Sequence, residues 1–326
     1  DSQSSRGVAK ITKENIDSLE NLFVESLRYS NCGYIIAEEF VEGDEYTAEG
    51  FASDYKHRTM AISKKKHFRL AIASSLEYPA QLSAEEKKKL VTFNDDFVEQ
   101  AGLRFGITHA EYIINHDTGK VYLVEIACRG GGTRISSDIT SWVSGQNVYE
   151  MFYENLCGRK TDVISMEILE KNAILYFFEF PEGKVKAIYG LDEARNVKGV
   201  FKLSISFKVG DILLPATEDR SRQGFLILFS ESKDDLDQSL KEVIKKVYSN
   251  EIFDVGGVSR SRKRDYEVDY YYYTGEKSVV IPVSTTYKKL HEKFIEKFKN
   301  KDFDIVSKTD EEDKFLIYVT GDKLQC

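Results

Sequence analysis

The sequence of 326 residues is long enough for one large or two ordinary domains, and a core of that size folds without a disulfide or a metal. Its net charge of −8 argues against general binding to nucleic acid, because phosphate backbones attract an excess of Lys and Arg. No stretch approaches the roughly 18 apolar residues of a membrane span, and the four scattered cysteines have neither metal-site nor secreted-disulfide spacing. We therefore expect a cytoplasmic protein that binds neither membranes nor nucleic acid.

The first half of the chain alternates between helices and hairpins. The expected elements are a helix capped by Thr12 with apolar residues from Ile16 to Leu27, strands at 34–40, 46–51, 107–114 and 121–126, and helices at 84–101 and 147–157. Ser83 and Glu86 form a capping box that opens the second of these helices. Its apolar stripe consists of Leu90, Phe93, Phe97 and Ala101.

The second half is richer in strands. Strands are expected at 173–180, 184–189, 200–207 and 224–230, before a helix that carries Leu236 to Val247. After a basic linker at 259–264 come the tyrosines at 270–273, a strand at 278–283, a helix from Leu290 to Phe298 and a strand at 315–319. We read the tyrosines as a strand with aromatic faces beside a solvated linker, and the alternative is contact with nucleic acid. The mixture of elements, with more hairpins than βαβ units, is typical of an α+β fold.

The hairpin at 107–126 contains two carboxylates that we expect to face each other. If the ladder is symmetric about Thr118, Glu111 lies directly opposite Glu125, at a Cβ separation of ~4.5–5.5 Å. Two opposed, partly buried carboxylates need a shared proton or a cation, and Mg²⁺ typically binds one or two carboxylates together with substrate phosphates. A register that differs by one or two residues, or exposure of the pair to solvent, would remove this requirement.

Arg129 follows the second carboxylate and opens a run of glycines, 130–132. Glycines allow the backbone to approach a ligand closely, and an Arg can bind a carboxylate or phosphate through two parallel hydrogen bonds. A run of this kind on its own is more commonly a flexible loop. Beside the two carboxylates, it favours a ligand site.

The segment AEEFVEGDEYTAEG at 37–50 resembles a hinge strand of the ATP-grasp superfamily, in particular of the carboxylate–amine ligase branch that includes the L-amino-acid ligases. The resemblance implies that Glu38 and Glu39 lie against the adenine amino group. It also implies that the backbones of Glu39 and Val41 bind the adenine ring and that Glu45 holds the ribose hydroxyls. Without the family, the same residues are an ordinary charged turn.

The segment HAEYIINHDTGKVYLVEIACRGGG at 109–132 resembles the metal-binding hairpin of the same family. The resemblance implies that Glu111 and Glu125 bind Mg²⁺, or Mn²⁺, and that Arg129 is catalytic, acting on the transferred phosphoryl group or on the substrate carboxylate. Ala127 stands where many members have Asn, which leaves the number of metal ions open.

The segment DSQSSRGV at 1–8 resembles the small-residue loop that closes over the ATP phosphates. Ser4, Ser5 and Gly7 would then offer backbone N–H groups to the phosphates. The Lys-Pro strand that usually precedes this loop is not in the chain, and the chain begins without Met, so we expect a fragment or a processed product. The run Lys64–Lys66 with His67 lies where the family often contacts phosphate or substrate, although such runs are more often solvated surface.

The resemblance implies a partial ATP-grasp fold of the α+β class, with antiparallel sheets flanked by helices and a small C-terminal α/β segment. We expect a nucleotide- and metal-binding portion at 1–160, a subdomain typical of amino-acid-ligase-like members at 161–257, and a segment of unknown role at 258–326. The implied function is an ATP-dependent ligase that joins a small-molecule carboxylate to an amine through an acyl phosphate, with release of ADP and phosphate. The alternatives are a biotin-carboxylase-like carboxylase and an inactive nucleotide-binding fragment, and a homo-oligomer is possible.

Overall fold

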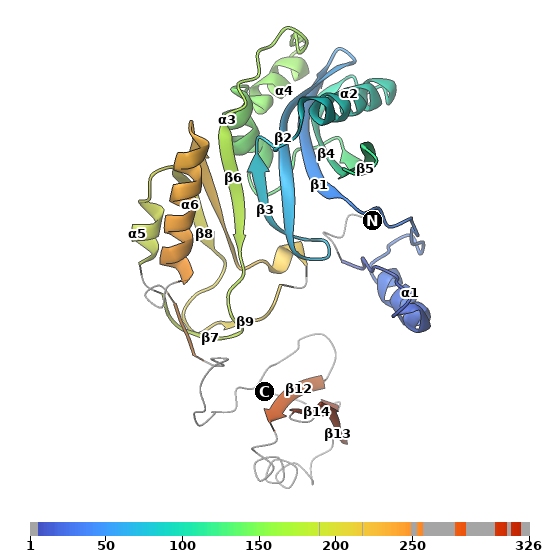
Figure 1. Ribbon diagram of the computed structural model, residues 1–326, viewed down its shortest axis with the longest axis vertical. Helices are drawn as coiled ribbons and strands as arrows, with labels where there is room; N and C mark the ends of the chain where they lie inside the picture. The colour runs from blue at the N-terminus through green and yellow to red at the C-terminus, as the bar shows by residue number, and fades with distance from the viewer. Residues whose placement is uncertain are drawn as a thin grey trace. The chain divides into compact units, whose positions relative to one another are not determined.

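A computed structural model describes residues 6–188, 190–216, 218–248, 253–256, 278–284, 304–311 and 314–320 (Figure 1). The chain divides into two compact units, Asp1–Gly256 and Gly257–Cys326, and each is considered by itself. The expected boundary near residue 160 lies within the first unit and stays a prediction.

The first unit is built on one antiparallel sheet of eight strands, in the order β5-β4-β1-β2-β3-β6-β10-β8. The strands are β1 (Asp44–Ser53), β2 (Lys56–Arg69), β3 (Ile72–Tyr78), β4 (Phe105–Asn115), β5 (Lys120–Ala127), β6 (Asn172–Phe178), β8 (Val200–Ile205) and β10 (Gly224–Ser230). The seam between β3 and β6 joins residues that are about a hundred positions apart in the sequence, from Ser75↔Tyr176 to Tyr78↔Ala173. The two halves of the unit therefore share a single sheet.

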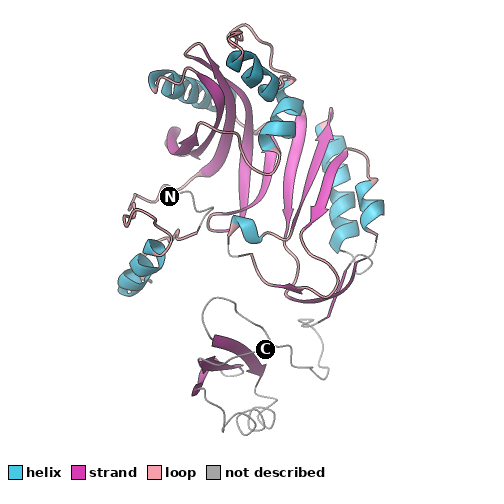
Figure 2. Cartoon of the chain, turned by 180° about the vertical axis from the view of Figure 1, so that it is seen from behind, coloured by secondary structure: helices cyan, strands magenta, loops and turns pink. Residues whose placement is uncertain are grey.

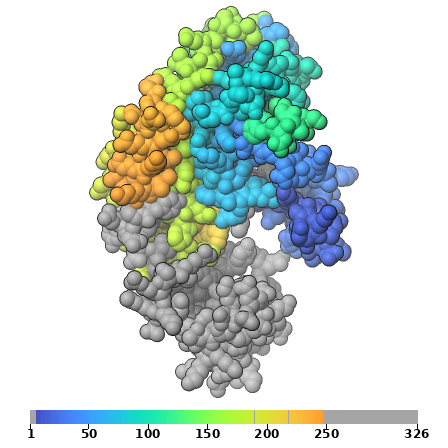
Figure 3. All heavy atoms as spheres, in the orientation of Figure 1, coloured from blue at the N-terminus to red at the C-terminus, as the bar shows by residue number. Residues whose placement is uncertain are grey.

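One face of this sheet is covered by α2 (Ala84–Gln100), α5 (Leu191–Arg195) and α6 (Lys233–Tyr248). Figure 3 shows α2 and α6 on the surface of the first unit in the view of Figure 1. The capping box of Ser83 and Glu86 is present, as predicted. The expected apolar stripe of α2 is partly wrong, because its buried residues are Leu90, Asn94 and Val98, whereas Phe93 and Phe97 are exposed.

The opposite face carries the π-helical turn η2 (Ile135–Ile139), α3 (Thr140–Ser144) and α4 (Val148–Leu156). Figure 2, seen from behind, shows α3 in front of the sheet. Ile135, Ile139 and Val143 pack there against apolar residues of β2, β3 and β6. Asn147 caps α4 by accepting hydrogen bonds from the backbone N–H groups of Tyr149 and Glu150.

The segment before β1 differs from the prediction. Thr12 caps no helix, because the first helical turn, η1 (Ile16–Ser18), begins after Asn15 and is followed by α1 (Leu19–Leu27). The backbone N–H of Thr12 instead donates to Asn15 Oδ1 at 2.7 Å. The strand expected at 34–40 is absent, and these residues form an irregular chain. No strand of the described residues pairs with them, and Tyr34 and Ile36 are 80% and 83% exposed.

The remaining elements include two smaller sheets. In the first unit, β11 (Phe253–Gly256), β7 (Gly183–Ile188) and β9 (Ile212–Leu213) form one sheet, and η3 (Asp219–Ser221) precedes β10. The second unit contains β12 (Ser278–Ser284), β14 (Lys314–Thr320) and β13 (Asp304–Glu311) in that order. The predicted features at 259–264, 270–273 and 290–298 lie outside the described residues. Within the described residues, no helix has both the length and the apolar character to cross a bilayer.

Candidate active site

Glu111 and Glu125 are paired directly across β4 and β5, as predicted. The register differs near the turn, where Asn115 pairs with Lys120 instead of with a residue one position further on. The ladder shifts between Glu111 and Tyr112, because Val124 is an extra residue on β5 that forms a β-bulge. The bulge restores the pairing that a ladder symmetric about Thr118 requires.

The two carboxylates differ in exposure. The side chain of Glu111 is 18% exposed, which agrees with the expectation of partial burial. Glu125 is exposed, so that expectation is wrong for the second carboxylate. The reason is the position of β5 at the edge of the sheet, where one side of the strand has no neighbour.

Lys65 on β2 joins Glu111 to Glu45. Its Nζ lies 2.9 Å from Glu111 Oε2 and 2.5 Å from Glu45 Oε1, and its side chain is 12% exposed. Burial lowers the pKa of Lys65, but Glu111 and Glu45 outweigh this effect and the net shift is upward. His67 extends the group, because its Nε2 lies 3.1 Å from Glu45 Oε2. In the sequence, Lys65 is one of three consecutive lysines, and nothing there distinguishes it from the other two. Its contact with both carboxylates follows from the pairing of β2 with β1, which places Lys65 opposite Glu45.

His109 and Glu49 lie behind Glu111, and the sequence analysis missed their role. His109 Nδ1 lies 2.7 Å from Glu49 Oε1, and His109 Nε2 lies 3.5 Å from Glu111 Oε1. Burial disfavours the charged imidazole, but the two carboxylates outweigh it and raise the pKa of His109 to about 10. Burial likewise raises the pKa of Glu111, while His109 and Lys65 together hold it well below its usual range. Glu111 is therefore an ionised carboxylate between two cations.

The loop after β5 is shaped by close packing. Arg129 is exposed, and its Nη1 donates to Gly130 O at 3.0 Å. A Cβ at Gly130 would lie 2.0 Å from Ser136 Oγ, so this position excludes any side chain. Thr133 and Arg134 have φ values of 45° and 64°, in the left-handed region that non-glycine residues seldom occupy.

The residues expected to bind the nucleotide form fewer of the described contacts with one another than the residues around Glu111 do. Glu38 and Glu39 are exposed in the irregular segment, and Val41 there is half-buried. Gly7 lies in a turn with φ +71°, where a Cβ would lie 2.9 Å from Tyr29 Cδ2. Ser4 and Ser5 lie outside the described residues. Of the described residues that were expected to bind the nucleotide, Glu45 is the one that connects to Glu111, through an ion pair of each carboxylate with Lys65.

The sequence matches two protein families in succession. Residues 2–138 match the ATP-grasp domain, and residues 176–249 match the L-amino acid ligase C-terminal domain 2. The chain carries an ATP-grasp domain. The resemblance to ATP-grasp ligases and the α+β fold, read from the motifs, are therefore confirmed, and the second match agrees with the resemblance to L-amino-acid ligases.

Solved structures agree on the fold. The L-amino acid ligase from Bacillus licheniformis is 21% identical with a TM-score of 0.54, over 64% of this chain and 54% of that one. Phosphoribosylglycinamide synthetase from Anaerococcus prevotii is 17% identical with a TM-score of 0.54, over 76% and 63%. Biotin carboxylase from Campylobacter jejuni is 13% identical with a TM-score of 0.57, over 74% and 54%. The chain thus spans a little over half of these proteins, and no curated protein matches its sequence.

The two opposed carboxylates can be compared with the ligands that Mg²⁺ normally takes. Within the described residues, no group of three or more His, Cys, Asp or Glu side chains is arranged to hold a metal. Mg²⁺ in nucleotide sites typically needs only one or two carboxylates, because phosphates and water complete the shell. Glu111 and Glu125, opposed across the ladder, supply two such carboxylates, and Lys65 and His109 already contact the first of them.

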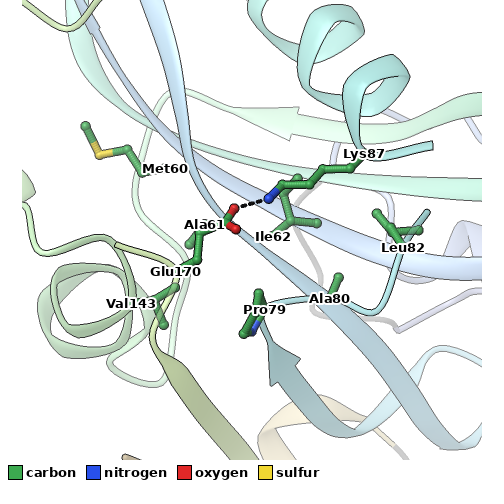
Figure 4. Close-up of a pocket in the computed structure, with 9 residues that line it drawn as sticks. All are labelled: Met60, Ala61, Ile62, Pro79, Ala80, Leu82, Lys87, Val143 and Glu170. Carbon is green, nitrogen blue, oxygen red and sulfur yellow. Dashed lines mark hydrogen bonds and ion pairs between the residues drawn. The ribbon is translucent and has the colours of Figure 1, made fainter. Parts of the chain in front are cut away.

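A small pocket elsewhere in the domain has a different character. It is lined by Met60, Ala61, Ile62, Pro79, Ala80, Leu82, Lys87, Val143 and Glu170 (Figure 4). Lys87 and Glu170 point toward each other and form an ion pair. The other lining residues are apolar, and none of them belongs to the carboxylate site, so the pocket has the character of a gap in the packing.

Proposed function

We propose that the protein is an ATP-dependent carboxylate–amine ligase that forms an amide through an acyl phosphate and releases ADP and phosphate. The succession of an ATP-grasp domain and an L-amino acid ligase C-terminal domain supports this proposal. The observation that carries it is the opposed pair Glu111 and Glu125, with Lys65 bound to the first carboxylate. The proposed substrates are a small-molecule carboxylate and an amine.

The proposed roles follow from charge. Glu111 and Glu125 would hold Mg²⁺, which would neutralise negative charge on the phosphoryl group during transfer. Lys65 lies beside Glu111 and would contribute a further positive charge on the same face of the sheet. Arg129 forms no ion pair with any described residue, so its remaining N–H groups are available to the phosphoryl group or to the substrate carboxylate.

The nucleotide contacts are part of the same proposal. Glu38, Glu39 and Val41 would bind the adenine, and Glu45 the ribose hydroxyls. Ser4, Ser5 and Gly7 would offer backbone N–H groups to the phosphates. The alternative function is an ATP-dependent carboxylase, in which bicarbonate is the phosphorylated acid.

Glu125→Gln provides a direct test. Fluorescent ATP is titrated onto the protein with Mg²⁺ and with EDTA, and the variant should lose the increase in affinity that Mg²⁺ provides. The control is Glu77→Gln, a carboxylate of the same sheet that pairs with Lys66 on its other face and should bind as the wild type does. Equal Mg²⁺ dependence in wild type and Glu125→Gln would contradict the metal assignment.

Product formation separates the two functions. ADP release that requires a carboxylate and an amine supports the ligase, and ADP release that requires bicarbonate supports the carboxylase. Wild-type protein that binds no Mg²⁺–ATP would refute both.

A further inference from the structure

A buried ion pair lies directly behind the candidate metal ligand. Glu49 on β1 and His109 on β4 are paired across the two strands, so their side chains lie on the same face of the sheet. The ion pair is formed by Glu49 Oε1 and His109 Nδ1 at 2.7 Å, with side chains that are 1% and 8% exposed. Glu49 Oε2 is buried and has no hydrogen-bond partner within the described residues. A buried glutamate is unusual and costs stability, which argues that it serves a purpose beyond packing.

The second nitrogen of His109 faces the active site. His109 and Glu111 are separated by one residue on β4, so both side chains point to the same face of the sheet. His109 Nε2 lies 3.5 Å from Glu111 Oε1, while Lys65 Nζ lies 2.9 Å from Glu111 Oε2. Each oxygen of Glu111 therefore has a different cationic neighbour, which limits the orientations that the carboxylate can take.

His109 also supports the loop that carries Arg129. A Cβ added to Gly131 would lie 3.0 Å from His109 Nδ1 and 3.0 Å from Ile135 Cγ2, so the loop backbone packs directly on the imidazole. The same side chain thus contacts the proposed metal ligand and the proposed catalytic loop.

We propose that Glu49 and His109 form a positioning pair that orients the Glu111 carboxylate for metal binding and holds the loop of Arg129 beside it. The proposal rests on the proposed function, since it assigns Glu111 to the metal. His109 touches neither substrate nor nucleotide in this role, and it acts through Glu111 and Gly131. Partners of this kind, one shell behind the ligands, typically contribute about 10–100-fold to metal affinity.

The test compares His109→Asn with a matched control, His57→Asn. His57 is also fully buried, with Nδ1 2.7 Å from Asp95 Oδ1 and Nε2 2.8 Å from Thr108 Oγ1. Its partner Thr108 is the neighbour of His109 on β4, so His57 lies on the opposite face of the sheet from His109 and Glu111. Both variants should lower the melting temperature, because each removes a buried hydrogen-bonded imidazole.

The Mg²⁺ concentration that gives half-maximal binding of fluorescent ATP distinguishes a positioning role from a structural one. His109→Asn should raise it about tenfold, and His57→Asn should leave it within about twofold of wild type. If both variants require the same Mg²⁺ concentration for half-maximal binding of fluorescent ATP, the proposal is overturned. Should His109→Asn not fold, Glu49→Met removes the acceptor of Nδ1 at similar side-chain volume and leaves His109 in place, and an unchanged Mg²⁺ requirement in that variant would overturn the proposal equally.

Failure of the proposed function gives a different result. In that case the wild type itself shows no Mg²⁺-dependent binding of ATP. If the wild type does show it and Glu111→Gln abolishes it, a normal Mg²⁺ requirement in His109→Asn refutes the positioning role alone.

Discussion

Replacing Lys65 by Met should destabilise the first unit of the protein by about 3 kcal/mol. The ammonium group lies within 2.9 Å of two carboxylates, Glu45 and Glu111, which are 20% and 18% exposed. Removing one partner of a buried ion pair typically costs 3–5 kcal/mol, because the other charge stays buried without compensation. We expect the lower end of this range, since Glu45 keeps His67 at 3.1 Å and Glu111 keeps His109 at 3.5 Å. The Met side chain also retains the apolar stem.

The neighbouring residue is a matched control. Lys66 is 51% exposed and pairs with Glu77 on the other face of the sheet, so Lys66→Met should cost about 0–1 kcal/mol. The assay is equilibrium unfolding in urea, with EDTA present, followed by the fluorescence of Trp142, the only Trp in the chain. Trp142 lies in α3 and donates to Asn172 O, so its emission monitors the first unit. A Lys65→Met variant no less stable than Lys66→Met would refute the idea that Lys65 balances two carboxylates.

Two further predictions concern α2. Hydrogen bonds from Ser83, then the contact with His116, lower the pKa of Glu86 from 4.5 to about 2, so the carboxylate stabilises the fold above about pH 4.5 and loses this effect as the pH falls. The melting temperature of Glu86→Gln should therefore lie below that of wild type at pH 6 and approach it at pH 3, and a constant difference would contradict this assignment. Leu90→Ala should cost about 2–5 kcal/mol in urea unfolding, because Leu90 is fully buried. Phe97→Ala should cost clearly less because Phe97 is 38% exposed, and equal losses would show that the apolar stripe read from sequence is the buried one.

The carboxylate pair was predictable because the chemistry of a short turn limits the register of a hairpin. The segment 115–120 marked the turn, and symmetry about it placed Glu111 opposite Glu125. The bulge at Val124 was not predictable, since the alternation of apolar residues on β5 gives no sign of an extra residue. The exposure of Glu125 was missed for a related reason, because the sequence does not say which strand lies at the edge of a sheet.

The strands β2 and β3 were not predicted. The residues of β2 that face the site include Ser63 and Lys65, so the alternation of apolar and polar residues that normally indicates a strand is lost there. The polar residue Asn94 replaces an expected apolar residue on α2 because it is buried between two hydroxyl groups, those of Thr59 and Tyr112. In each case a functional or hydrogen-bonded polar side chain takes a place that periodicity assigns to the core.

The seam between β3 and β6 has a practical consequence. A chain ending near residue 160 would present the backbone N–H and C=O groups of β3 (Ile72–Tyr78) to solvent, and a chain beginning there would present those of β6 (Asn172–Phe178). Exposed strand edges of this kind pair readily with other chains and promote aggregation. Produced separately, the portions before and after residue 160 would each expose one unpaired strand edge and would tend to aggregate. The two regions should therefore fold correctly only as parts of one chain.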